Sequence, residues 1–194
     1  MVLMISVTGM PGSGKSIVAK RISEKIGWPI YSMGDIVREE VRRRGLELTA
    51  ENIEYVAKKL REELGLAAVG ILLRKKIESQ REKLEGVVVD GMRSVYEARE
   101  LANIGELCII AVHASPMTRY RRMIERGRRG DIRGWEDFVL RDRYNLSFGI
   151  GELIALADFM IVNEGDLEDL YKNVDNIIEV LSNDGYTRCS GGRY

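Results

Sequence analysis

The sequence has few of the residues that bind transition metals or form disulfides, with one histidine, His113, and two cysteines, Cys108 and Cys189, among 194 residues. Two distant cysteines are too few for a disulfide framework or a cysteine metal site. We expect Cys108, which lies in an apolar run, to be a buried free thiol in a reduced, cytoplasmic protein. We interpret His113, at the end of the same run, as a core residue rather than a catalyst.

A long hydrophobic segment and a net charge are also lacking. The 30 basic and 30 acidic residues cancel, so no overall field would attract nucleic acid or a membrane surface. No run approaches the roughly 20 apolar residues of a membrane-spanning helix, and the apolar start leads into a glycine-rich motif rather than a signal-peptide cleavage site. Glutamine occurs once, at Gln80, among 31% charged residues, a bias typical of thermophilic proteins. A hydrophobic content of 45% predicts one domain with a sizeable core.

One complete motif is present near the start of the chain, and it matches the pattern G-x-x-x-x-G-K-[ST]. An apolar run at 2–7 precedes it and a helical pattern at 17–26 follows, which makes a chance match in a glycine-rich turn the weaker interpretation. Glycines let several backbone N–H groups face one point at a helix N-terminus, where they bind phosphate. We expect Lys15 to reach the β- and γ-phosphates and Ser16 to ligate Mg²⁺. The sequence therefore predicts binding of ATP·Mg²⁺ by Gly9, Met10, Pro11, Gly12, Ser13, Gly14, Lys15 and Ser16.

Apolar strand patterns alternate with amphipathic helix patterns along the rest of the chain, which predicts a three-layer α/β sandwich with a parallel sheet. The expected strands are 2–7, 30–32, 86–90, 107–112 and 157–162. The stretch 34–85 has no strand signal and is expected to be a helical excursion, with pauses at Gly65 and Gly70. We expect one domain over 1–182, with a core (1–33, 86–118, 144–182), the insert 34–85, a lid at 119–143 and a flexible tail at 183–194.

Ligands of such sheets bind beyond the carboxyl ends of the strands, where three further residues are expected. Asp90 ends a buried strand and would hold Mg²⁺ through water, or else fix a turn. Arg93 would grip an acceptor phosphate, or else be an exposed residue at a helix start. Asp35 would be a general base, or a charge that complements the helix dipole, and local pattern favours the second role. Arg38 lies one turn further on the same helix face.

Seven arginines crowd one part of the chain: 119, 121, 122, 126, 128, 129 and 133. They would form a mobile lid over the phosphates, a strip that binds RNA, or a solvated helix surface. Glycines at 127, 130 and 134 favour a hinged flap. Trp28, Trp135 and the methionines are expected to pack against other side chains.

Several of these segments together resemble one family. The phosphate loop resembles the G-x-P-G-x-G-K loop of adenylate kinase and other nucleoside monophosphate kinases. The segment 34–38 resembles that family's G-D-x-x-R, and 90–93 resembles its D-G-x-P-R without the proline. Arg122 and Arg126 resemble the R-x-x-x-R pair at the start of the lid, and Arg141 and Arg143 resemble the pair on the helix that leaves it.

The resemblance implies a sheet in the order 2-3-1-4-5, an acceptor-binding excursion and a short lid rich in arginine. It implies that Arg122 lies by the donor adenine and that the acceptor is bound by Gly34, Asp35, Arg38, Asp90, Gly91 and Arg93. Ser16 and Asp90 would hold the metal. The catalytic groups would be Lys15, Asp35, Arg126, Arg141 and Arg143.

The segment 157–167 looks more like the end of dephospho-CoA kinase, a family in which an aspartate near position 35 is the base for a ribose hydroxyl. The mixture resembles an archaeal group of adenylate-kinase-related P-loop proteins. We therefore expect a small-molecule kinase that transfers the γ-phosphoryl of ATP·Mg²⁺ to a nucleotide-like acceptor, AMP first, as a monomer or homodimer with no membrane partner. The alternatives are transfer to a ribose hydroxyl and a slow ATPase switch that binds RNA or a protein.

Overall fold

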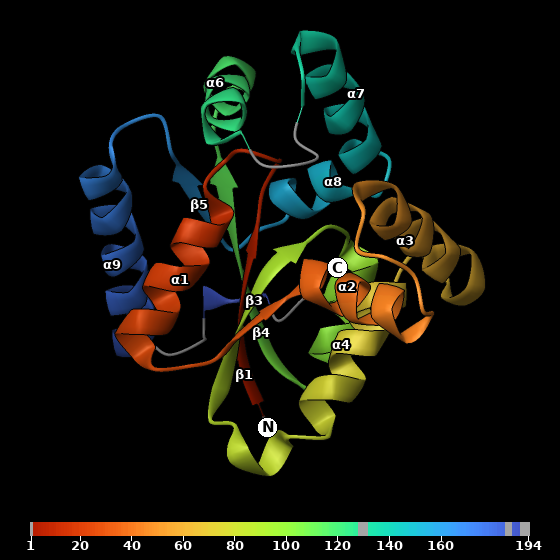
Figure 1. The fold of residues 1–194 in the computed structure, drawn as a ribbon. Coiled ribbons are helices and arrows are strands. Elements are labelled where there is room, and N and C mark those ends of the chain that lie inside the picture. Colours follow the sequence, from red (N-terminus) through yellow and green to blue (C-terminus); the bar gives the residue numbers. More distant parts are fainter. Residues whose placement is uncertain (1, 128–131, 185–187, 191–194) are drawn as a thin grey trace.

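In a computed structural model that describes residues 2–127, 132–184 and 188–190, five strands form one sheet. They are β1 (Val2–Thr8), β2 (Ile30–Ser32), β3 (Gly86–Met92), β4 (Gly105–His113) and β5 (Phe159–Val162). Every paired neighbour runs parallel in the order β2-β3-β1-β4-β5. The predicted fold class and strand order are confirmed. Since all strands point the same way, the loops that follow them meet at one edge of the sheet (Figure 1).

Helices cover both faces of the sheet (Figure 1). One face carries α1 (Lys15–Ile26) and α9 (Leu167–Asp184), and the other carries α2 (Met33–Arg43), α4 (Ala68–Glu78) and α5 (Val95–Ala102). α3 (Ala50–Leu64) and the short η1 (Arg81–Lys83) complete the stretch between β2 and β3, which is helical as predicted. α6 (Pro116–Arg126) and α7 (Trp135–Leu146) stand beyond the carboxyl ends of the strands, and α8 (Ile150–Ala155) leads back to β5.

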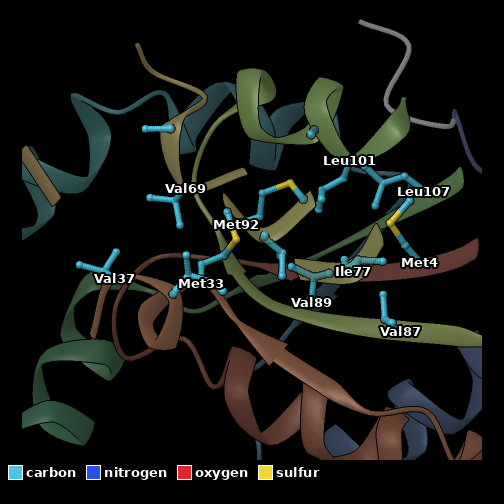
Figure 2. Close-up of a cluster of buried hydrophobic side chains, with 14 of the residues drawn as sticks. Met4, Met33, Val37, Val69, Ile77, Val87, Val89, Met92, Leu101 and Leu107 are labelled. Carbon is cyan, nitrogen blue, oxygen red and sulfur yellow. The ribbon is translucent and has the colours of Figure 1, made fainter. Parts of the chain in front are cut away.

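Strand residues alternate between two hydrophobic cores because successive side chains point to opposite faces. Val87 and Val89 of β3 face the larger core, which Figure 2 shows, together with Met4, Leu101 and Leu107. Val88 faces the other core, beneath α1 and α9. Burial of each such side chain contributes about 1.5–3 kcal/mol, so the β-branched run of β3 anchors both layers.

Gly70 differs from its predicted role as a pause between helices, since it lies inside α4. A Cβ atom at this position would lie 2.9 Å from Cα of Glu97 on α5. The glycine therefore permits close packing of α4 on α5. Gly65 does end a helix, with φ of 80° at the C-cap of α3.

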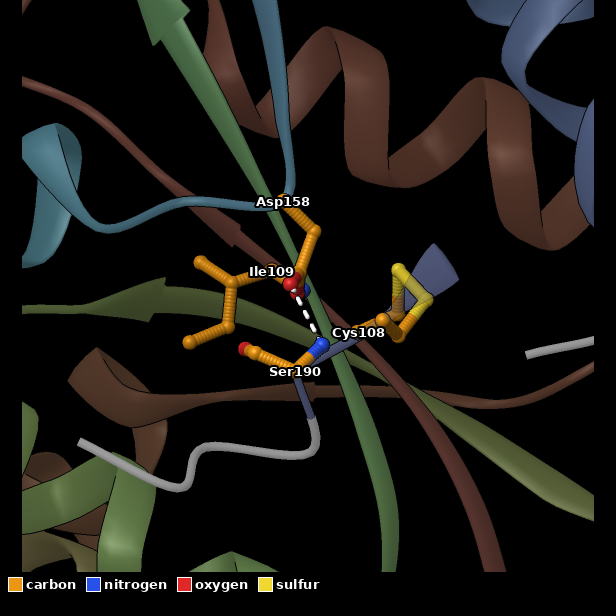
Figure 3. The surroundings of a disulfide bond; sticks show 5 residues. Cys108, Ile109, Asp158 and Ser190 are labelled. Carbon is orange, nitrogen blue, oxygen red and sulfur yellow. Dashed lines mark hydrogen bonds between the residues drawn. A yellow bond between two sulfur atoms is a disulfide. The ribbon is translucent and has the colours of Figure 1, made fainter. Parts of the chain in front are cut away.

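The cysteine prediction is wrong, because Cys108 on β4 forms a disulfide with Cys189. Figure 3 shows Asp158 beside this bond, where its carboxylate accepts hydrogen bonds from backbone N of Ile109 at 2.8 Å and of Ser190 at 2.6 Å. The disulfide and these two bonds fasten the segment after α9 to the sheet. Part of the predicted tail, 185–187 and 191–194, lies outside the described residues.

His113 is exposed, contrary to the expectation of a core residue. Trp28 packs as expected, since a Cβ atom at Gly86 would overlap its ring. Among the described helices, none combines the length and the apolar content that crossing a membrane requires. Because Cys108 and Cys189 are paired, these cysteines do not indicate a reduced compartment.

Candidate functional site

The phosphate loop joins β1 to α1 and packs against two other segments. Gly12 and Gly14 have φ of 81° and 99°, a region that side chains with a Cβ rarely adopt. A Cβ atom on Gly12 would lie 2.8 Å from the carbonyl oxygen of Arg119, and one on Gly14 would lie 2.4 Å from Nδ2 of Asn163. The glycines thus allow both the curl of the loop and its contact with α6 and with the segment after β5.

Lys15 is partly buried at the start of α1, and desolvation lowers the pKa of its ammonium group to about 8. The carboxylate of Asp90 opposes the shift, while Arg93, Arg126 and Arg141 add to it by repulsion. Three cations and one carboxylate thus act on this lysine. Such a surplus of positive charge suits a polyanionic ligand, which would stabilise the charged lysine.

Asp90 lies beside the loop because β3 pairs with β1, the strand that leads into the loop, and Asp90 is opposite Val7. The register of β1 against β3 shifts between Val7 and Thr8, opposite Asp90 and Met92. Ser16 donates a hydrogen bond of 2.8 Å from its hydroxyl to Oδ2 of Asp90. Oδ1 of Asp90 is buried and has no hydrogen-bond partner among the described residues. A carboxylate oxygen left open beside a hydroxyl is a donor set that fits Mg²⁺, which prefers oxygen ligands.

The acceptor residues predicted on α2 contact each other. Nε of Arg38 donates to Oδ1 of Asp35 at 3.0 Å, and a second guanidinium nitrogen lies 2.7 Å from the same oxygen. Gly34 lies under this guanidinium, since a Cβ atom there would be 3.2 Å from it. The shared helix face is as expected, and the aspartate is held by the arginine.

Arg93 is partly buried after β3, so it is not the exposed helix-start residue of the alternative interpretation. Burial lowers the pKa of its guanidinium, and Arg61 and Arg141 lower it further, whereas Glu97 raises it. Its backbone N donates to Oε2 of Glu97 at 2.7 Å. Gly91, with φ of 89°, carries the chain past Lys15 into this position.

Arg119 is buried and therefore does not belong to a solvated helix surface. Its guanidinium is buried, binds Asp142 of α7 through two hydrogen bonds of 2.8 and 2.6 Å, and lies over the ring of Phe138. The same guanidinium donates to the carbonyl oxygens of Pro11 at 3.2 Å and Ala114 at 3.1 Å. This contact set, here called the Arg119 clamp, connects α6, α7 and the phosphate loop.

Arg122 also touches the loop region indirectly. It donates to the carbonyl oxygen of Asn163 at 3.0 Å, and Nδ2 of Asn163 donates to the carbonyl oxygen of Ser13 at 2.8 Å. The structure thus places Arg122 beside the segment after β5, on the side of the loop away from the acceptor residues of α2. Sequence reasoning missed Asn163, although its place directly after a strand end was a usable signal.

The other lid arginines differ in position. Arg126 and Arg141 lower the pKa of Lys15 by repulsion, whereas Arg143 in the last turn of α7 is exposed. Arg121 and Arg133 are exposed, and Arg128 and Arg129 lie outside the described residues. A small core of Met123, Ile132 and Phe138 packs α6 against α7. The arginine cluster is therefore no uniform strip.

A family match and several sequence relatives cover most of the chain. Residues 8–138 match the family AAA_17, described as an AAA domain. The chain is 49% identical over 182 residues to a UPF0200 protein of Methanocaldococcus jannaschii, covering 93% of this chain and 92% of that protein. It is 47% identical over 182 residues to a UPF0200 protein of Pyrococcus abyssi, covering 92% of this chain and 97% of that protein.

Solved structures share the fold at low sequence identity. TT1252 from Thermus thermophilus has a TM-score of 0.64 at 21% identity, covering 93% of this chain and 98% of its own. Shikimate kinase from Acinetobacter baumannii, solved with shikimate, has a TM-score of 0.62 at 14% identity, covering 95% of this chain and 96% of its own. These likenesses show a P-loop kinase fold. The UPF0200 relatives and the family match show that the chain belongs to the UPF0200 family and carries an AAA_17 domain.

Proposed function

We propose that this protein is a kinase that transfers the γ-phosphoryl group of ATP·Mg²⁺ to a small nucleotide-like acceptor, with AMP as the first candidate. The observation that carries the proposal is the charge around Lys15. Arg93 from the predicted acceptor side and Arg126 and Arg141 from the lid helices all act on the lysine of the phosphate loop. These three arginines come from three segments of the chain, and they would surround the phosphoryl group as it passes from ATP to the acceptor.

The residues present suffice for such a transfer, because phosphoryl transfer depends on positioning and charge neutralisation. Lys15 and the loop amides would hold the donor phosphates. Ser16 and Asp90 would hold Mg²⁺, which when bound neutralises charge on the β- and γ-phosphates. Arg126 and Arg141 would neutralise the charge that develops on the transferring group, and Arg122 would lie by the donor base.

The first experiment isolates the donor half. Calorimetric titration with a non-hydrolysable ATP analogue should show binding that Mg²⁺ strengthens. The Asp90→Asn variant should keep binding without the metal and lose most of the strengthening by Mg²⁺. Equal dependence on Mg²⁺ in wild type and variant would contradict the role of Asp90.

A hydroxyl acceptor is the second candidate, and Asp35 supports it. Its carboxylate lies next to Gly34 in the first turn of α2 and is paired with Arg38, which would hold it in a fixed orientation. Shikimate kinases and a sugar kinase, whose names denote hydroxyl-bearing acceptors, share the fold. Asp35→Asn separates the candidates, because a phosphate acceptor needs no strong base. A loss of about 100-fold or more in turnover indicates a hydroxyl acceptor, and a mild loss indicates phosphate.

The ATPase-switch alternative has weaker support. An RNA-binding strip needs free guanidinium groups, and those of Arg119 and Arg122 are engaged within the protein. Hydrolysis without an acceptor-dependent product, stimulated by RNA and weakened steeply by salt, would favour the switch over the kinase.

A further inference from the structure

A polar cluster between α3, the start of α5 and α7 joins the predicted acceptor residue Arg93 to two residues that were not predicted to bind the acceptor. Arg61 of α3 places its guanidinium over the ring of Phe148, 4.1 Å from the centroid. Tyr144 of α7 packs edge-on against the same ring at 4.6 Å between centroids. Arg93 joins the cluster through Glu97, whose carboxylate accepts from backbone N of Arg93 and lies 3.8 Å from the guanidinium of Arg61. Arg61, in the predicted excursion, thus meets Tyr144 and Phe148, which lie just after the predicted lid.

The cluster holds hydrogen-bond donors that no described residue accepts from. The hydroxyl oxygen of Tyr144 is fully buried and has no hydrogen-bond partner within 2–127, 132–184 and 188–190. Over the same residues the guanidinium of Arg93 forms no hydrogen bond or ion pair, and only its backbone N is engaged, by Glu97. Arg61 donates from one nitrogen to the carbonyl oxygen of Ala57 at 2.8 Å, and stacking on Phe148 leaves the rest of its N–H edge for other partners. Buried polar groups are rarely left unpaired, so this set requires an explanation.

The charges of the cluster do not balance. Glu97 is its buried carboxylate; one of its oxygens accepts from backbone N of Arg93, and the other lies 3.8 Å from Arg61. Burial raises the pKa of Glu97, which weakens it further as a counter-charge. Arg61, Arg93 and nearby Arg141 therefore outnumber the buried carboxylate. Glu54 also acts on Tyr144 but is exposed on α3.

We propose that Arg61, Arg93 and the Tyr144 hydroxyl form an oxyanion subsite that binds a phosphate or carboxylate group of the acceptor. Two guanidinium groups supply planar, paired donors that match the oxygens of such a group. The hydroxyl supplies a third donor from the opposite helix. The inference rests on the proposed function and names what its acceptor must carry, which is an ionised oxyanion.

The subsite also changes the role expected of Arg38. Arg38 is paired with Asp35 on α2, whereas Arg93 is grouped with Arg61 and Tyr144. The two arginines predicted to hold one acceptor phosphate thus belong to separate contact sets. Because Arg61 lies on the excursion and Tyr144 on α7, an oxyanion bound between them would draw these two segments together.

The test is a nuclear magnetic resonance titration that observes the Nε–Hε signals of Arg61 and Arg93, assigned from the Arg61→Lys and Arg93→Lys spectra. The protein is saturated with a non-hydrolysable ATP analogue and Mg²⁺ so that the phosphate loop is occupied. Inorganic phosphate and acetate are added separately at constant ionic strength. We expect a saturable shift of both signals, with tighter binding of phosphate indicating a phosphorylated acceptor and tighter binding of acetate indicating a carboxylate acceptor.

Two tyrosine variants make the test specific. Tyr144→Phe removes one hydroxyl and keeps the ring contact with Phe148, and should weaken oxyanion binding roughly tenfold or more. Tyr55→Phe, at an exposed tyrosine on α3, should leave the affinity unchanged. The same affinity in both variants, or no saturable shift of either signal, would overturn the subsite. A second titration compares AMP with adenosine, and AMP binding that moves neither signal would overturn it as well.

A failure of the proposed kinase function can be distinguished from a failure of the oxyanion subsite. The titration with the ATP analogue reports on the donor loop alone. If the analogue does not bind, the donor half of the proposal fails, while shifts of Arg61 and Arg93 with phosphate still report on the subsite.

Discussion

The Arg119 clamp gives the sharpest test of how the lid helices and the phosphate loop depend on each other. The side chains of Arg119 and Asp142 are only 5% and 15% exposed. Asp142→Ala removes the carboxylate and leaves a guanidinium buried without its bidentate partner. Breaking a buried pair in this way costs about 3–5 kcal/mol. The free energy of unfolding, measured by urea titration followed by circular dichroism, should fall by this amount.

A second readout of the same variant concerns the ligand. The guanidinium of Arg119 also donates to the carbonyl oxygen of Pro11 in the loop. If the arginine shifts after loss of Asp142, the loop loses a hydrogen bond to a charged donor, worth about 1.5 kcal/mol, and affinity for an ATP analogue should fall roughly tenfold. Calorimetry of the folded variant measures this loss.

Two controls decide whether the clamp explains the result. Lys59→Ala breaks an ion pair with Glu62 that lies on the surface of α3, and should leave stability and affinity nearly unchanged. The double variant Arg119→Met, Asp142→Leu replaces the pair by apolar side chains and should be more stable than Asp142→Ala. If Asp142→Ala were as stable as Lys59→Ala, the reasoning would be refuted.

Three further predictions concern other parts of the molecule. Lys15 has a pKa of about 8 in the folded protein, below its usual 10.5. Between pH 8 and pH 10.5 the unfolded chain therefore binds more protons than the folded protein, so the free energy of unfolding should rise with pH in this range. Urea titrations of the Lys15→Met variant should lack this rise. The affinity for an ATP analogue should fall above pH 8 as the free lysine loses its charge, which calorimetry at several pH values can check. Gly70→Ala places a Cβ atom 2.9 Å from Cα of Glu97 and should lower thermal stability by about 1–3 kcal/mol, whereas Gly134→Ala, with no atom within 4 Å, should change it little. Cys189→Ser opens a disulfide between residues 81 apart and should destabilise the protein by roughly 2–5 kcal/mol in urea, and an unchanged midpoint would contradict this.

Features that follow from short stretches of sequence could be predicted. β-branched residues without polar alternation indicate a central parallel strand that is covered on both faces. The run Val87-Val88-Val89 has this pattern, and all three side chains are buried. Gly12 and Gly14 mark the loop because positive φ is needed there. Ser115 and Asp166 precede α6 and α9, and their side chains accept hydrogen bonds from backbone N of Thr118 and Asp169.

Contacts between distant side chains could not be predicted in the same way. Arg119 looks like its neighbours in the sequence, and only the packing of α6 on α7 brings it to Asp142. Cys108 and Cys189 show no spacing pattern that would predict a disulfide. They are paired because the segment after α9 packs against β4 of the sheet. Nothing in the helical sequence pattern around Arg61 distinguishes it from its neighbours. It becomes a candidate binding residue only because α3 packs near Phe148.

The measurement that tests the central proposal most directly is transfer of label from γ-labelled ATP·Mg²⁺ to a panel of nucleoside monophosphates, dephospho-CoA and small alcohols, with products separated and identified. We expect a labelled product that appears only with an acceptor, with AMP first in the panel, and that is lost in Lys15→Met. Arg143→Ala, at the exposed lid arginine, tests its predicted catalytic role in the same assay. Release of labelled phosphate alone, at the same rate with and without every acceptor, would contradict the kinase proposal.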